Sequence, residues 1–131
     1  MKQAMLPPSY KAILRDGAAA LRHTAGLLRH RADREREPGE TLLALRDIAG
    51  LAWRLECTEE WEWEQGFASL SLGGQDLAVL DSLIEENLKS SPYADDSIVD
   101  NGRRRGQQLA TLRDFLARYT MGEFIARGGG N

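Results

Sequence analysis

The stretch Thr41–Trp63, TLLALRDIAGLAWRLECTEEWEW, decides the fold of this 131-residue chain. It is the most apolar segment of the sequence, and it contains all three tryptophans and the only cysteine. Its apolar residues recur at intervals of three and four, which places them on one face of an α-helix. The residues in this series are Leu42, Leu45, Ile48, Ala49, Ala52 and Leu55.

Leu43, Leu51 and Trp53 widen this apolar face well beyond a narrow stripe. A helix that is apolar on so many sides is either surrounded by other helices or presents one flank to a partner. We favour the first interpretation, in which the segment is the central helix of a core. The polar side consists of four residues, Arg46, Asp47, Gly50 and Arg54.

The composition of the whole sequence indicates a single helical domain covering residues 1–131. Of the residues, 42% are apolar and 28% are charged, as in ordinary globular proteins. Leu, Ala, Arg and Glu are abundant and β-branched residues are scarce, which favours helix over sheet. We therefore predict an all-α, compact four- to five-helix bundle, with a flexible arm at 1–8 and a flexible tail at 128–131.

Periodicity and helix-breaking residues predict the helix positions. Ser9 is a suitable N-cap for the first helix, and Pro38-Gly39 ends the segment that follows it. We predict four principal helices at 9–34, 41–57, 76–90 and 104–127, with a short helical segment near 59–67. Residues 93–102 are predicted to be a polar connection.

Charge is unevenly distributed along the chain. Residues 1–39 carry a net charge of +4, residues 40–100 carry −11, and residues 101–131 carry +4. Such asymmetry indicates either a charged partner or basic helices that neutralise acidic ones inside the bundle. We slightly favour the internal explanation, and both remain open at this stage.

Basic residues in the first and last helices form a candidate surface for an anionic partner. Arginine side chains suit phosphate oxygens, and such contacts hold a nucleic-acid backbone without reading its sequence. The sequence pI of about 5.4 argues against a nucleic-acid binder that acts alone, so this contact would belong to a larger complex. The residues proposed for it are Lys11, Arg15, Arg22, Arg29, Arg103, Arg104 and Arg105.

The segment 59–64 suggests a different class of function, because it interleaves carboxylates with tryptophans. Exposed aromatic anchors among charges are common at protein interfaces. The alternative is that both indoles lie in the core, and the sequence does not decide between the two. The candidate protein-interface residues are Trp61, Trp63, Glu59, Glu60, Glu62 and Glu64.

Metal and catalytic chemistry have weaker support. His23 and His30 would lie about 10 Å apart along a helix, too far to share one ion. Cys57 is predicted to be a buried, inert thiol. Carboxylates from several helices could hold a divalent cation in a hydrolase, but a solvated acidic face is favoured. Those carboxylates are Glu59, Glu60, Glu85, Glu86, Asp95, Asp96 and Asp100.

These observations lead to a non-enzymatic helical interaction protein that acts as a small subunit or adaptor in a larger complex. Its arginine-rich faces would contact an anionic partner, with nucleic acid as one candidate. The alternative is an acidic, tryptophan-bearing regulator of the inhibitor or immunity type, which binds and blocks another protein. A carboxylate–metal hydrolase is a distant third. We predict no catalytic, metal or cofactor-binding residue, no membrane contact and a cytoplasmic location.

Overall fold

The computed structural model describes residues 6–65, 74–88 and 96–124, and these parts of the chain contain helices but no strand. The predicted all-α bundle of four to five helices is confirmed. A short helix also forms in the predicted segment near 59–67. In chain order the helices are α1 (Tyr10–Ala32), α2 (Gly39–Cys57), α3 (Glu60–Glu64), α4 (Gly74–Leu88) and α5 (Asp96–Thr120).

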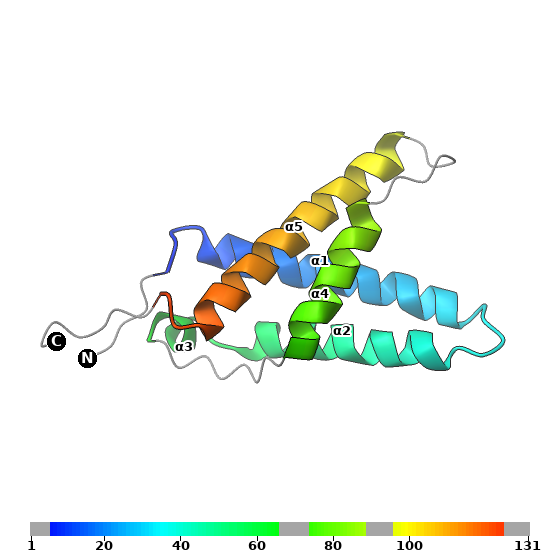
Figure 1. Ribbon diagram of the computed structural model, residues 1–131, viewed down its shortest axis with the longest axis horizontal. Coiled ribbons are helices and arrows are strands. Elements are labelled where there is room, and N and C mark those ends of the chain that lie inside the picture. The colour runs from blue at the N-terminus through cyan, green and yellow to red at the C-terminus, as the bar shows by residue number, and fades with distance from the viewer. Residues whose placement is uncertain (1–5, 66–73, 89–95, 125–131) are drawn as a thin grey trace, which may run out of the picture.

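The long helices form two antiparallel pairs that cross each other (Figure 1). The first pair is α1 with α2, and the second pair, α4 with α5, runs across it at a steep angle. α1 is the shared element, because it packs against both α2 and α5. The core lies at this crossing and includes the nearly inaccessible side chains of Leu21, Ile48, Leu51, Leu80, Leu109, Leu112 and Leu116.

Small residues on α1 allow the two pairs to approach closely. A Cβ atom added to Gly17 would lie 2.6 Å from Cδ2 and 2.8 Å from Cβ of Leu112 on α5. Since Cβ atoms do not approach one another so closely, α5 can cross α1 here only because residue 17 has no side chain. Ala18, Ala20 and Ala25 are buried nearby on the same helix.

An aromatic cluster fixes α3 against the C-terminal half of α5. The ring centroid of Trp63 lies 4.9 Å from that of Tyr119 and 5.7 Å from that of Phe115. The Tyr119 hydroxyl donates a hydrogen bond to the Trp63 carbonyl oxygen at 3.2 Å. Phe124 stacks on Phe115 with centroids 5.4 Å apart. This cluster holds the end of the α1–α2 pair against α5.

The predicted boundaries of the last helix were wrong at both ends. α5 begins at Asp96, so 96–102 is helical rather than part of a polar connection. Gly102 and Gly106 lowered the predicted helix propensity there, but both are buried on one face of α5, where packing outweighs propensity. At the other end, Gly122 has a φ of 76° and its N–H binds the Tyr119 carbonyl at 3.0 Å, which ends the helix at Thr120 instead of 127.

Several smaller predictions also need correction. Cys57 is exposed, not buried, because it lies on the side of α2 that faces away from α1 and α4. Leu6, in the predicted flexible arm, packs against the core. α1 ends at Ala32 rather than 34, and α4 covers 74–88 rather than 76–90. The tail at 128–131 lies outside the described residues.

Candidate interaction surfaces

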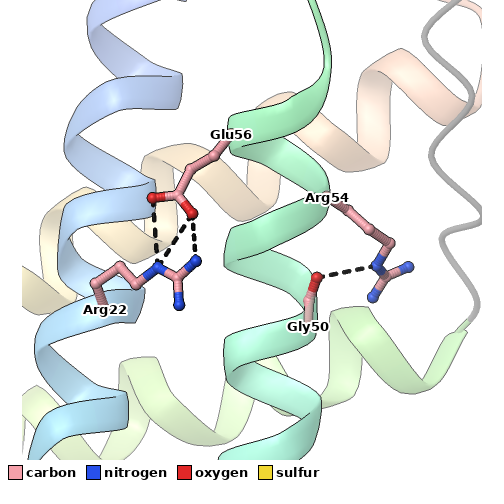
Figure 2. Close-up of polar contacts among 4 residues, drawn as sticks. All are labelled: Arg22, Gly50, Arg54 and Glu56. Carbon is pink, nitrogen blue, oxygen red and sulfur yellow. Dashed lines mark hydrogen bonds and ion pairs between the residues drawn. The ribbon is translucent and has the colours of Figure 1, made fainter.

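The predicted cationic residues of α1 mostly form ion pairs within the chain. Lys11 pairs with Glu60 of α3, and Arg22 makes a bidentate contact with Glu56 of α2. Figure 2 shows this second contact bridging the two helices. The Lys11 ammonium group donates a hydrogen bond to the Glu60 carboxylate, and this raises the pKa of Lys11 and lowers the pKa of Glu60. This flank of α1 is therefore largely neutralised by its neighbours.

The remaining predicted cations are more available. Arg15 is exposed, and its contact with the adjacent Asp16 is 3.3 Å. Arg29, Arg103 and Arg104 are exposed, and no acidic partner is found for them among the side chains of residues 6–65, 75–86 and 101–124. Arg105 is half-buried and has a contact of its own.

These cations do not gather on one surface. Arg22 and Ile13 are nine residues apart, which places them on opposite sides of α1 at about 100° per residue. Arg22 faces α2, whereas Ile13 lines a groove with Arg104 of α5. The cationic flank of α1 and the arginines of α5 are therefore separated by the body of α1.

Part of the internal pairing joins the basic ends of the sequence to its acidic middle. Besides Lys11–Glu60 and Arg22–Glu56, two further contacts connect these segments. Arg31 of α1 lies 3.8 Å from Glu86 of α4, and Arg113 of α5 lies 3.0 Å from Asp81 of α4. Ion pairs within the chain thus neutralise several of the charges that make the sequence asymmetric. Arg103 and Arg104 take no part in these four ion pairs.

The two tryptophans of segment 59–64 have different environments. Trp63 is 2% exposed and belongs to the aromatic cluster, so it is a core residue. Trp61 is 55% exposed, and its indole N–H donates a hydrogen bond to the Glu59 carboxylate at 2.7 Å. The predicted interface residues therefore do not form one continuous surface.

The carboxylates of this segment also have structural roles. Glu62 accepts a hydrogen bond from the Glu59 backbone N–H at 2.8 Å, which satisfies a donor at the start of α3. Glu64 accepts a hydrogen bond from the Tyr10 hydroxyl at 2.6 Å, and burial together with this carboxylate raises the pKa of Tyr10 above its ordinary value. Glu60 is held by Lys11. The carboxylates of Glu60, Glu62 and Glu64 therefore contribute to the fold through contacts within the chain.

No metal centre is found in the described part of the chain, where no three His, Cys, Asp or Glu side chains lie close enough to share an ion. His23 and His30 are both exposed, and a 3.3 Å contact joins His30 to Arg34. Asp95 lies outside the described residues, as do the side chains of Asp96 and Asp100. Nor do the described helices include one long and apolar enough to cross a bilayer.

One face of α2 is exposed, although the favoured interpretation of the sequence placed this helix at the centre of the core. Leu42, Leu43 and Trp53 were assigned to the core, but they are 48%, 53% and 61% exposed. They lie opposite the buried residues of the same helix, together with Arg46, Gly50 and Cys57. A separate count of the two faces of the helix would have found this surface, because apolar residues occupy both.

A groove of about 450 Å³ opens between α2 and α4 on the other side of the molecule. Leu28, Ile48 and Leu83 contribute apolar lining, and Arg31 and Glu86 stand at its edge. It arises where the two helix pairs diverge, and the lining combines apolar side chains with charges of both signs. Its lining includes none of the residues predicted for the anionic-partner or protein-interface surfaces.

Comparisons with protein-family models, with curated proteins and with solved structures give no significant match for this chain. The functional argument therefore relies on the surfaces described above.

Proposed function

We propose that this chain is a non-enzymatic helical interaction protein that acts as a subunit or adaptor in a larger complex. Its docking surface is the outward face of α2. We also propose a cytoplasmic location, where reducing conditions would keep the exposed Cys57 thiol free.

The observation that carries this proposal is the exposure of three large apolar side chains on one helix face. Leu42 and Leu43 stand near the start of α2, and Trp53 stands about three turns further along. Single exposed apolar residues are ordinary, but several on one face, including a tryptophan, are typical of interaction sites. Few charges interrupt this surface, and Arg46 is the principal one.

Co-purification tests this function with the tagged chain and two matched variants. Trp53→Ala removes the proposed anchor, whereas Met121→Ala removes a side chain that is 75% exposed just after α5. Loss of a central tryptophan anchor weakens interfaces about tenfold or more. We expect the W53A variant to lose its stoichiometric partner and the M121A variant to keep it. Equal recovery of the same partners by both variants would contradict the proposal.

A second candidate function concerns an anionic partner, and it is supported by Arg103 and Arg104. Both are exposed in the first half of α5, and no acidic partner is found for them among the described side chains, which do not include those of 96–100. Contacts of this kind would add a phosphate-binding surface to a protein adaptor.

A salt-dependent gel shift with single- and double-stranded nucleic acid tests this second function. We expect binding at low salt that the double variant R103A/R104A loses. The R22A variant should retain binding, because Glu56 already neutralises Arg22. An unmodified chain that binds neither form of nucleic acid at low salt would rule this function out for the isolated protein.

A further inference from the structure

On the outward face of α2, residues that are equidistant from the centre of the helix can make favourable contacts with each other. Leu42 and Cys57, Arg46 and Trp53, and Ala49 and Gly50 are three pairs equidistant from the midpoint of residues 49 and 50. Arg46, Trp53 and Cys57 are exposed, as is Leu42. In an antiparallel two-fold dimer centred at this midpoint, each residue of a pair lies opposite the other member of that pair on the second copy. The two members must therefore suit each other.

The chemistry of each pair suits direct contact between two antiparallel copies of the helix. Arg46 of one copy would lie over the Trp53 ring of the other, a favourable cation–π arrangement that occurs twice. Leu42 would pack beside Cys57. Two like-charged Arg46 side chains would remain about 10 Å apart along the axis, since seven residues separate Arg46 from Trp53.

The centre of this face is small and open. A Cβ atom added to Gly50 would meet nothing within 4 Å, and the neighbouring position is Ala49. Small residues at a helix crossing allow the axes to approach and the larger flanking side chains to interlock. This face therefore has large side chains towards both ends and small residues at its centre, an arrangement that allows a second copy of α2 to pack against it.

Charges at the edge of the face are also complementary. Asp47 and Arg54 lie seven residues apart on the same flank of α2, and an antiparallel two-fold brings this flank against its own copy. Asp47 of one copy would then stand within about 3 Å, measured along the axis, of Arg54 in the other. Within one chain Asp47 already contacts Arg46 at 3.8 Å and Arg54 is held by Asp76 at 2.9 Å, so a contact between the two copies would add to these pairs. Arg54 also donates a hydrogen bond to the Gly50 carbonyl at 3.3 Å, as Figure 2 shows.

We infer that α2 pairs with α2 of a second copy of this chain, antiparallel, with the two-fold axis between Ala49 and Gly50. A parallel pair would place Arg46 against Arg46 and lose both cation–π contacts. This inference rests on the proposed function, because it names the occupant of the same docking surface.

Sedimentation equilibrium under reducing conditions is the first test. Across about 1–100 µM protein, the apparent mass should rise from 14.6 kDa toward twice that value. W53A should raise the dimer dissociation constant about tenfold or more, and M121A should leave it unchanged. A monomer throughout this range would overturn the dimer. If W53A still abolished capture of a different protein, the proposed function would survive this failure.

Cysteine cross-linking tests the register. In the inferred dimer the two Cys57 residues are offset by about 22 Å along the axis, so a short bis-maleimide should not join unmodified chains. Leu42→Cys places a new thiol opposite the partner's Cys57, and it should produce a covalent dimer. The double variant L42C/C57S should give none, and neither should Gln107→Cys, at an exposed position on α5. Efficient cross-linking of the unmodified chain, or none in L42C, would overturn the antiparallel register.

Discussion

The two faces of α2 have similar hydrophobicity and different environments. On the inner face Ile48, Leu51 and Leu55 are almost completely buried against the neighbouring helices. On the outer face Leu43 and Trp53 are 53% and 61% exposed. Burial therefore follows from where α1 and α4 lie and is not determined by the hydrophobicity of the helix itself. The inner face contributes stability, and the outer face is available for binding.

Replacing tryptophans from the two environments gives the largest expected difference. Trp63→Ala removes a fully buried ring that contacts Tyr119 and Phe115, and it should lower the free energy of unfolding by about 3–5 kcal/mol. Trp53→Ala removes a mostly exposed ring, and in the monomer it should change that free energy by less than about 0.5 kcal/mol.

Urea unfolding followed by circular dichroism measures both free energies. It should be done at low protein concentration, so that association through α2 does not contribute. Comparable losses in W63A and W53A would mean that the outer face is part of the folding core, and the distinction between the two faces would then fail.

The fold was largely predictable because helix formation leaves strong local signals. Spacings of three and four, together with Pro38-Gly39, were sufficient to locate α1 and α2 within a few residues. The extension of α5 back to Asp96 was missed because Gly102 and Gly106 lower local propensity, and only packing compensates for them.

The surfaces were harder to predict, because they depend on how helices are placed around one another. The cationic residues of α1 and α5 looked like one set in the sequence, but Ile13 and Arg22 show that opposite sides of α1 serve different neighbours. Trp61 and Trp63 are only two residues apart, yet one indole is exposed and the other is buried. Spacing along a helix gives the relative directions of its side chains, but the positions of the neighbouring helices determine which of them are buried.

Two glycines of α1 extend the comparison of inner and outer positions to the backbone. Gly17→Ala places a methyl group within 2.6 Å of Leu112, so overpacking should outweigh the gain in helix propensity and lower the free energy of unfolding by about 1–2 kcal/mol. Gly26 lies on the same helix, and a Cβ atom added there meets nothing within 4 Å. Gly26→Ala should therefore raise the free energy of unfolding by up to about 1 kcal/mol.

Thermal unfolding of the two variants shows the effect as shifts of opposite sign in Tm. Each serves as the control for the other, because both add one methyl group to α1. A stabilising G17A substitution would contradict the close crossing of α1 and α5.

The smallest expected effect is a pH dependence on the buried side. Burial, and then the hydrogen bond to Glu64, raise the folded-state pKa of Tyr10 above its ordinary value of 10.0, because a phenolate would be buried beside a carboxylate. The protonated tyrosine therefore stabilises the folded state fully below about pH 10, and this stabilisation is lost as pH rises from there toward the raised pKa. Tyr10→Phe should lower the free energy of unfolding by about 1 kcal/mol at pH 8, and the difference from the unmodified chain should shrink at pH 11.

W53A supplies the outer-face control, since the difference in unfolding free energy between W53A and the unmodified chain should stay constant between the two pH values. A Y10F difference that does not change with pH would show that the Tyr10–Glu64 contact does not couple ionisation to folding.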